Sequence, residues 1–377
     1  MNNKIKKKIW INAGEASGDM HGALLAENLV KNDPDIEVMG MGGPAMEKAG
    51  CDIRYPMSMI SLMGVTEVLP KLPRLLRLFG EIEKIWKKEK PAAVVLIDCP
   101  DFNFRLAKKA KRLGIPVYYY ISPQVWAWRQ GRTKFLHKTV RKILCILPFE
   151  KQFYNERGVD ADYVGHPLLD LIPVEELDKI SPHKNQLGIL PGSRSKEISS
   201  LMPIFSEVAR KLKDDHPELK FVIARAPGVD VKKITSSWPD NLDLEIVEPE
   251  NRYEMMRSSS FLLAASGTAT LESALIGTPT VIAYKMSAIT GSLAKKFLKV
   301  KYVSLCNLIL NREVLPELLQ DNCTVKKIHA QAEEWVAQPE KTKKTRTDLK
   351  IMREKVGSPG AASRAAKIIM QDLKISE

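Results

Sequence analysis

Short apolar segments alternate with helix-forming segments along most of the chain. Residues 9–13 form the first apolar run; a glycine-containing loop follows, and a helical pattern begins at about residue 21. Residues 92–97 are apolar throughout, which is typical of a parallel strand buried on both faces. Strands that alternate with helices predict a parallel sheet built from β–α–β units. The other strands predicted in the first half are residues 37–43, 116–121, 142–147 and 161–164.

The same pattern restarts after a polar segment, residues 170–184, which contains two prolines and is predicted to be a linker. We therefore expect an α/β fold with two Rossmann-like domains, residues 1–168 and 185–345, followed by a helical tail over residues 346–377. A length of 377 residues agrees with about two domains. The strands predicted in the second half are residues 187–190, 219–224, 244–247, 261–265 and 280–284.

One helical stripe runs through residues 71–88. Its apolar residues recur at positions 72, 75, 76, 79, 82, 85 and 86. Most such stripes face a protein core. The methionines at 57, 59 and 63 and the flanking lysines and arginines are also typical of a helix that lies at a membrane surface. The pattern leaves both interpretations open.

The chain is basic, with a formal net charge of +13. This charge suits nucleic acid, an anionic membrane surface or a phosphorylated substrate. Because many lysines lie on predicted helices as ordinary solvent-exposed residues, the charge alone selects none of these partners.

The five cysteines are scattered and show no CxxC or Cys/His ligand spacing. This argues against a structural zinc site and against a disulfide framework, and it favours reduced thiols in the cytoplasm. The basic N-terminus lacks the apolar segment of a signal peptide, and no run of about 18 apolar residues is available to span a membrane.

Polar residues follow the strand predicted at 92–97. Asp98 comes first, and the C-terminal ends of strands in open α/β sheets face the ligand, so Asp98 is a candidate general base. Its neighbour Asp101 is suited to cap the next helix. The DxxD spacing has no evident third ligand, so no metal site is predicted.

Two further loops of the first half carry candidate chemistry. The loop after the first strand holds Glu15, Asp19 and His21, and its carboxylates argue against a phosphate cradle. It is either an ordinary surface turn or a loop that faces a ligand other than a phosphate. After residues 116–121, Trp128 and Arg129 are suited to stack on a sugar or base, although structural packing is the commoner use of such residues.

The second half offers two anion sites, each at a junction between a strand and a helix. In the first, Ser193 and Arg194 precede a helix, and helix N-termini with an arginine bind anions well. In the second, Gly267 and the hydroxyls of Ser266, Thr268 and Thr270 are expected to face a phosphate, and Glu272 to accept the ribose hydroxyls. Each motif is weak alone, but the pair is a moderately strong signal for a nucleotide.

Taken together, these motifs resemble one family, the lipid-A-disaccharide synthases, over nearly the whole chain. The matching segments are AGEASGD (13–19), DCPDFN (98–103), SPQVWAWR (122–129), GHP (165–167), LPGSR (190–194), SGTATLE (266–272) and residues 307–317 with Gln320. One departure is Ser304-Leu305-Cys306, where the family pattern has a glycine and a proline before Asn307.

The resemblance implies an inverting glycosyltransferase of the GT-B type, with two Rossmann-like domains facing across a cleft and a C-terminal helix that returns to the first domain. It implies transfer of 2,3-diacylglucosamine from UDP to the 6-hydroxyl of 2,3-diacylglucosamine 1-phosphate in lipid A biosynthesis. The implied location is the cytoplasmic face of the inner membrane of a Gram-negative cell, without cofactor, metal or nucleic acid. Both a monomer and a swapped homodimer fit the sequence.

The resemblance also distributes roles among the candidate residues. Asp98 becomes the expected base, with Glu15 and His21 as alternatives. The UDP side comprises Ser193, Arg194, Ser266, Gly267, Thr268, Thr270 and Glu272; the acceptor side comprises Ser17, Asp19, Asn103, Trp128, Arg129 and Asn307; the acyl and membrane patch comprises Val65, Val68, Leu69, Leu72, Leu75 and Leu76.

Three rival functions remain at this point. A UDP-N-acetylglucosamine 2-epimerase would share the nucleotide half but not residues 98–103 or the two tryptophans, and a transferase acting on a peptidoglycan precursor would share the fold. A non-enzymatic basic protein that binds membranes or nucleic acid would need neither nucleotide loop.

Overall fold

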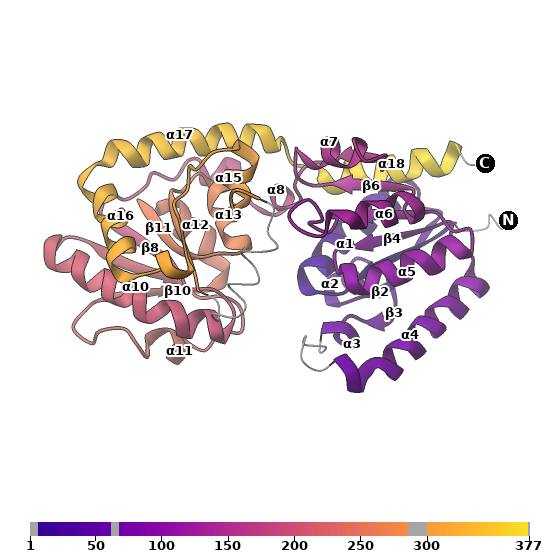
Figure 1. The fold of residues 1–377 in the computed structure, drawn as a ribbon, viewed down its shortest axis with the longest axis horizontal. Coiled ribbons are helices and arrows are strands. Elements are labelled where there is room, and N and C mark those ends of the chain that lie inside the picture. The colour runs from indigo at the N-terminus through magenta and orange to yellow at the C-terminus, as the bar shows by residue number, and fades with distance from the viewer. Residues whose placement is uncertain (1–6, 62–67, 286–299, 376–377) are drawn as a thin grey trace. The chain divides into compact units, whose positions relative to one another are not determined.

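The chain folds into two compact units. The computed structural model describes residues 7–61, 68–285 and 300–375, and the side chains of residues 61–72 and of 374 onward lie outside this description. The first unit comprises the chain up to Asp170 together with the C-terminal segment from Ser358, and the second unit runs from Leu171 to Gly357 (Figure 1).

The first unit is built on a seven-stranded parallel sheet with the order β3-β2-β1-β4-β5-β6-β7. The central strands β1 and β4 are the apolar runs of the sequence, and from Ile9 onward β1 is buried, as is all of β4. The strands are β1 (Lys7–Ala13), β2 (Ile36–Gly42), β3 (Asp52–Pro56), β4 (Ala93–Ile97), β5 (Val117–Tyr120), β6 (Lys142–Cys145) and β7 (Ala161–Tyr163).

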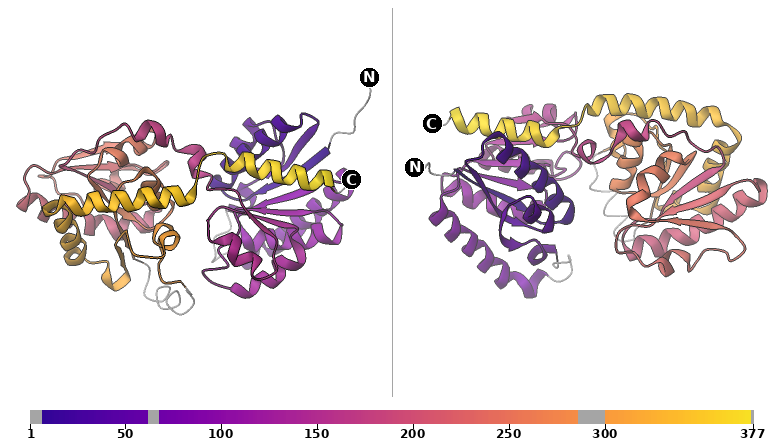
Figure 2. Two further views of the ribbon diagram at one scale, coloured as in Figure 1. Left: turned by 90° about the horizontal axis from the view of Figure 1, so that it is seen from above. Right: turned by 180° about the vertical axis from the view of Figure 1, so that it is seen from behind.

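Helices cover both faces of this sheet. One face packs with α4 and α5, and the other with α1 and the C-terminal helix α18, which lie side by side (Figure 2). The helices are α1 (Ala16–Asn32), α2 (Pro44–Lys48), α3 (Ser58–Ser61), α4 (Val68–Glu89), α5 (Pro100–Arg112), α6 (Thr133–Thr139), α7 (Glu150–Asn155), α8 (Leu168–Leu171) and α18 (Ala361–Ile375).

The second unit repeats this plan with a six-stranded parallel sheet of the order β10-β9-β8-β11-β12-β13. Every strand predicted in this half is present. The strands are β8 (Gln186–Leu190), β9 (Lys220–Ala224), β10 (Leu244–Val247), β11 (Phe261–Ala265), β12 (Thr280–Tyr284) and β13 (Glu317–Leu319).

The helices of the second unit again form two layers. The core on one face contains side chains of α10, α11 and α16, while α13 contacts α12, α15 and α17. The helices are α9 (Val174–Leu177), α10 (Ser195–Asp215), α11 (Val231–Thr235), α12 (Arg252–Ser258), α13 (Thr268–Ile276), α15 (Leu305–Leu310), α16 (Val325–Ala337) and α17 (Pro339–Val356).

The C-terminal tail is divided between the units. The boundary expected at residue 346 falls inside α17, which contacts α13, α15 and α16 of the second unit up to its end at Val356. Only α18 packs on the first unit, against α1. Gly357 separates the two helices, with a φ of 89° that favours glycine, so the chain changes direction there.

The stripe predicted along α4 mainly faces the core. Phe79, Ile82 and Trp86 are buried in the first unit, and so is Leu75, which was expected to belong to the membrane patch. Leu76 is 59% exposed. Val65 lies outside the described residues, and the side chains of Val68, Leu69 and Leu72 are not described. Among the described helices, none is both long and apolar enough to cross a membrane.

Candidate active site

Asp98 lies at the C-terminal end of the central strand β4, in a tight turn. Asp98 and Cys99 both adopt left-handed backbone angles, with φ values of 46° and 43°. Such angles cost a non-glycine residue about 1–2 kcal/mol. The turn is held by Asn103, whose amide donates to the carbonyls of Ile97 (3.0 Å) and Asp98 (2.7 Å). The Asn103 amide therefore holds Asp98 in a strained turn at the end of the strand.

Asn103 itself is completely buried and accepts a hydrogen bond from Asn12 of β1 at 2.8 Å. Its amide is occupied by the backbone of the turn, and a contact between Asn103 and the acceptor stays a prediction. Asn103 thus holds the backbone of Asp98 in place.

The loop after β1 lies against the Asp98 turn. A Cβ atom on Gly14 would come within 2.6 Å of Cys99 Sγ, so only glycine allows the two loops to approach this closely. Glu15 and Ser17 follow and are exposed. Burial raises the pKa of Asp98, and the negative charge of Glu15 raises it further. The two carboxyl groups therefore act on each other electrostatically, which is the environment expected of a general base.

Asp19 and His21 behave differently from their exposed neighbours. Asp19 is buried and accepts hydrogen bonds from the backbone of Gly43 (2.7 Å), Ala45 (2.9 Å) and Met46 (3.2 Å), which caps α2. Asp19 therefore has a structural role in this unit, and a contact between Asp19 and a sugar stays a prediction. His21 is also buried, and burial lowers its pKa to about 4, so its ring is neutral at pH 7.

The loop after β5 is organised by a carboxylate that the sequence did not single out. Glu150 is buried at the start of α7, and it accepts hydrogen bonds from Trp126 Nε1 (2.9 Å), Ser122 Oγ (3.3 Å) and the backbone N–H groups of Ile146 (3.2 Å) and Leu147 (3.0 Å). Burial raises the pKa of Glu150 to about 7. No local pattern marks this glutamate, because its partners come from two separate loops.

Of the two tryptophans, only one is available to a ligand. Trp126 is buried on Glu150, whereas Trp128 is 40% exposed and the guanidinium of Arg129 lies over its ring at 4.4 Å. Stacking of this kind gives a flat, cationic surface. Trp128 and Arg129 therefore match the exposure expected of acceptor-side residues.

On the predicted UDP side, Arg194 stands at the N-terminus of α10. Its side chain is 79% exposed, and it pairs with Glu197 one turn later at 3.2 Å. Gly192, two residues earlier, has a φ of 99°, and a Cβ there would come within 2.7 Å of the Glu197 carboxylate. Ser193 is exposed as well. The loop thus exposes the Arg194 guanidinium and Ser193 to solvent at the N-terminus of α10.

The second loop, from Ser266 to Glu272, has both exposed and buried members. Gly267 and Thr268 are exposed at the start of α13, where the helix offers unpaired N–H groups. Ser266 is half-buried and does not cap the helix, since Gly267 occupies the capping position. Thr270 differs from the expectation: it is buried, and its hydroxyl donates to the carbonyl of Gly267 at 2.7 Å.

Glu272 lies one turn further along α13 and is held by two residues of α12. Tyr253 donates its hydroxyl to Glu272 Oε1 at 3.0 Å, and Arg252 donates to the same tyrosine oxygen at 2.7 Å. No motif marks these two residues in the sequence, because they follow a different strand, β10.

Asn307 has a structural role in the second unit. It is completely buried and its amide makes four hydrogen bonds: it donates to Leu315 O (2.8 Å) and Glu317 Oε1 (2.8 Å), and it accepts from Val314 N (2.8 Å) and Leu315 N (3.0 Å). These bonds fix the segment that leads into β13. A place for Asn307 in the ligand site stays a prediction.

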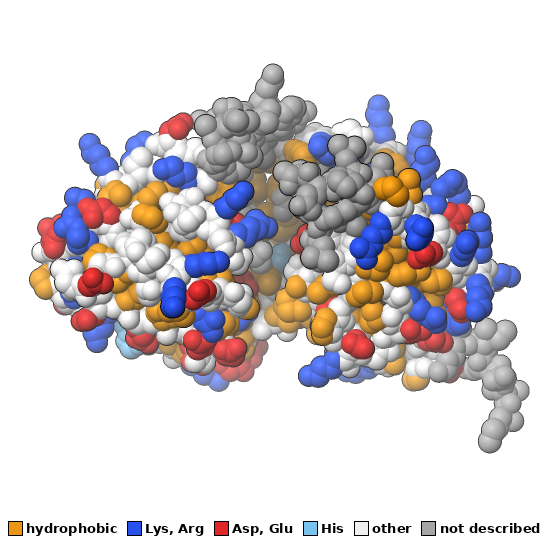
Figure 3. Space-filling model, turned by 90° about the horizontal axis from the view of Figure 1, so that it is seen from below, with side chains coloured by type: hydrophobic (Ala, Val, Ile, Leu, Met, Phe, Trp, Pro, Cys, Tyr) orange, Lys and Arg blue, Asp and Glu red, His pale blue; other side chains and the backbone are white. Residues whose placement is uncertain are grey.

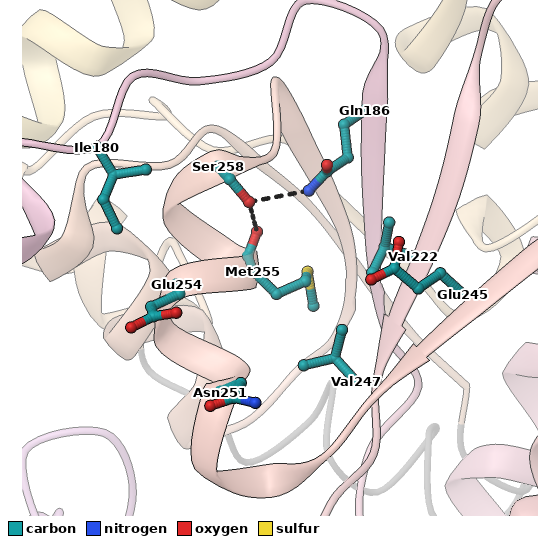
Figure 4. Close-up of a pocket in the computed structure, with 9 residues that line it drawn as sticks. All are labelled: Ile180, Gln186, Val222, Glu245, Val247, Asn251, Glu254, Met255 and Ser258. Atoms are coloured by element: carbon teal, nitrogen blue, oxygen red, sulfur yellow. Dashed lines mark hydrogen bonds between the residues drawn. The ribbon is translucent and has the colours of Figure 1, made fainter.

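A pocket of about 390 Å³ lies between α12 and the strands β9 and β10 (Figure 4). In it, the amide of Gln186 donates to Ser258, and Ser258 donates to Met255 O. None of the predicted site residues lines this pocket. It is lined by Ile180, Gln186, Val222, Glu245, Val247, Asn251, Glu254, Met255 and Ser258.

Two parallel α/β units with candidate residues at the C-terminal ends of their strands define this chain as an α/β protein of the GT-B class. Solved structures share the fold. A UDP-GlcNAc 2-epimerase from Neisseria meningitidis bound to UDP-GlcNAc matches with a TM-score of 0.62 over 98% of this chain and 100% of that chain. Medicago truncatula UGT71G1 in complex with UDP-glucose matches with a TM-score of 0.64 over 99% of each chain. Both are 13% identical to this chain, so they show the fold alone.

The sequence comparisons define the family. The family model of lipid-A-disaccharide synthetase matches residues 9–371. The lipid-A-disaccharide synthase of Myxococcus xanthus is 39% identical over 97% of both chains, and that of Geobacter sulfurreducens is 36% identical over 99% of both. The chain belongs to the lipid-A-disaccharide synthase family.

Proposed function

We propose that this protein joins two diacylated glucosamines, taking 2,3-diacylglucosamine from UDP and transferring it to the 6-hydroxyl of 2,3-diacylglucosamine 1-phosphate. The observation that carries the proposal is the pair of strand-end sites in a chain of this family. One has a half-buried carboxylate, Asp98, and the other has a guanidinium and a helix N-terminus suited to a diphosphate.

Asp98 is the general base in this proposal. Its carboxylate takes the proton of the acceptor hydroxyl while that oxygen forms a bond to the anomeric carbon of the donor. The bond from the anomeric carbon to the UDP oxygen breaks on the opposite face, and UDP leaves with the electron pair. One displacement inverts the configuration and gives a β-1,6 linkage. The raised pKa of Asp98 makes it a stronger base than an exposed aspartate.

UDP gains negative charge as it leaves, and cationic or hydrogen-bond-donating groups must stabilise this charge. Arg194 and the free N–H groups at the start of α13, near Gly267 and Thr268, are the groups assigned to this role. Glu272 is assigned to the ribose. On the acceptor side, Glu15, Ser17, Trp128 and Arg129 are the exposed residues that remain as sugar contacts.

Both substrates carry acyl chains, so the protein is proposed to work at the surface of the inner membrane. Leu76 is exposed on α4 between the exposed residues Arg74 and Arg77. In the view of Figure 3, hydrophobic side chains gather on the first unit, with lysines and arginines around them. An apolar residue flanked by cations is suited to an anionic bilayer.

The test of Asp98 is the turnover of Asp98→Asn. The amide cannot accept the proton, so we expect the turnover number to fall by roughly 10²- to 10⁴-fold. UDP binding is expected to stay at the wild-type level, because the nucleotide is assigned to the other unit. The measurement is the rate of disaccharide formation together with calorimetric titration of UDP.

The matched control is Asp101→Asn. Asp101 lies three residues further on, in the first turn of α5, and its carboxylate is 82% exposed and pairs with Arg132 at 2.9 Å. We expect this variant to keep most of its activity. A wild-type turnover number in Asp98→Asn would remove Asp98 from the mechanism.

A further inference from the structure

Glu272 is held by a short chain of hydrogen bonds that crosses from α12 to α13. The Tyr253 hydroxyl donates to Glu272 Oε1 at 3.0 Å, and Arg252 Nη2 donates to the Tyr253 oxygen at 2.7 Å. The guanidinium carbon of Arg252 also lies 4.0 Å from the centre of the Tyr253 ring. All three residues are partly buried, with 34% of the Arg252 side chain and 14% of the Glu272 side chain exposed.

This arrangement uses only one oxygen of the Glu272 carboxylate. The described residues provide no hydrogen bond to the second oxygen, Oε2, and the side chain keeps 14% of its surface exposed. A carboxylate can accept about four hydrogen bonds, so the group retains capacity for a ligand with adjacent hydroxyl donors. A ribose presents two such hydroxyls.

Tyr253 restricts the orientation of that carboxylate. A glutamate side chain loses conformational entropy when its orientation is fixed. If the fold already fixes it, that entropy is not lost when the ligand binds, and the ligand binds more tightly. The donor from Arg252 polarises the tyrosine hydroxyl and strengthens its bond to Glu272. Burial raises the pKa of Glu272, while Arg252 and the Tyr253 hydroxyl lower it and favour the ionised acceptor.

We propose that Tyr253, supported by Arg252, is the positioning residue for Glu272 and makes the site selective for nucleoside diphosphates with an intact ribose. The inference rests on the proposed function, which assigns UDP to this unit. Its competitor is a purely structural role, in which the Tyr253 hydroxyl only ties α12 to α13.

The experiment compares Tyr253→Phe with wild type in calorimetric titrations of UDP, 2′-deoxy-UDP and 3′-deoxy-UDP. Wild type is expected to bind UDP more tightly than at least one deoxy nucleotide. Tyr253→Phe is expected to weaken UDP binding by roughly tenfold, since a hydrogen bond to a charged group is lost. The same change is expected to weaken binding of that deoxy nucleotide by less than about twofold, because the contact that Tyr253 organises is already missing.

The matched control is Tyr55→Phe. Tyr55 also donates its hydroxyl to a glutamate, Glu81, at 3.3 Å, but in the first unit. We expect this variant to bind all three nucleotides as wild type does. In turnover assays, Tyr253→Phe is expected to raise KM for the UDP-sugar and to change kcat by less than about threefold.

The remaining outcomes separate the two proposals. Equal weakening of UDP and of both deoxy nucleotides in Tyr253→Phe means a structural role and overturns the inference. If Tyr253→Phe binds UDP as wild type does while Glu272→Gln binds it more weakly, the inference is overturned. The assignment of the UDP ribose to Glu272 then still holds. If Glu272→Gln also binds UDP normally, the assignment of the ribose to Glu272 fails.

Discussion

Asp98 lies in a strained, partly buried turn at the end of β4. Its turn has two left-handed residues, a buried amide that ties the turn to the strand, and a neighbouring carboxylate. Strain of this kind persists only where the surrounding structure holds it, and it concentrates at functional sites. The family motif predicted the residue, but the strain and the support from Asn103 are visible only in the fold.

The pH dependence of the reaction tests the coupling between Asp98 and Glu15. The base must be ionised, so kcat/KM is expected to fall as the pH drops through the pKa of Asp98. Glu15 raises that pKa. In Glu15→Gln the repulsion is absent, so the acidic limb of the profile is expected to move to lower pH. The measurement is kcat/KM from pH 4 to pH 8.

Two results would contradict this interpretation. An acidic limb that stays in place would show that the two carboxyl groups are not coupled. A collapse of the plateau rate by the factor expected for Asp98→Asn would instead make Glu15 the base.

Three residues that the family motifs assign to ligand contacts also have structural roles. Asp19, Asn103 and Asn307 use their polar atoms on backbone groups. Sequence alone could not separate these roles, because a carboxylate or amide that binds a sugar hydroxyl has the same chemistry as one that caps a helix or closes a turn. Only burial and the hydrogen-bond partners distinguish them.

At the scale of elements, α4 shows how one helix serves two purposes. Its apolar positions recur often enough to fill the core, and Phe79, Ile82 and Trp86 do so. Leu76 lies one residue beyond the buried Leu75 and projects away from the core, because one residue turns the helix by about 100°. The periodicity predicted the helix, but not which edge of the stripe would remain exposed.

The exposed edge of α4 is tested by Leu76→Ser. We expect binding to vesicles that contain anionic lipid to weaken by about tenfold, which corresponds to ~1.4 kcal/mol and is consistent with the partial burial of one leucine. The measurement is co-sedimentation with vesicles of phosphatidylglycerol and phosphatidylcholine.

The control for this test is Ile351→Ser on α17. Ile351 is also an exposed aliphatic residue beside a cation, 41% exposed against 59% for Leu76 and preceded by Lys350, but it lies in the second unit. Vesicle binding is expected to be unchanged in this variant. Equal loss in both variants would argue against a specific membrane contact at α4.

At the scale of the whole molecule, the C-terminal segment returns to the first unit and is bonded there. The carboxylate of Asp170, the last residue of the first unit before the chain enters the second, accepts hydrogen bonds from the backbone of Gly360, Ala361 and Ala362 at the start of α18. Arg364 donates to Val164 O at 2.7 Å. The two points where the chain passes between the units are thus bonded to each other.

The sequence predicted the two parallel sheets because each strand is an apolar run between helical segments. It did not predict that α17 would belong to the second unit, because the pattern within a helix does not show which unit covers its buried face. The assignment of each helix to a unit depends on the element that covers its buried face. The buried face of α18, with Ala365, Ala366 and Ile369, shares a core with α1. Periodicity shows that a face is buried but not against what.

The most direct test of the account is the product of the reaction. UDP-2,3-diacylglucosamine and 2,3-diacylglucosamine 1-phosphate are supplied together with the wild-type chain and with Asp98→Asn, and the products are analysed by mass spectrometry and by NMR of the new linkage. We predict a β-1,6-linked disaccharide 1-phosphate and an equal amount of UDP from wild type, and neither from the variant above roughly 1% of that rate. An epimerised UDP-sugar, or no disaccharide from a chain that binds both substrates, would contradict the proposed function.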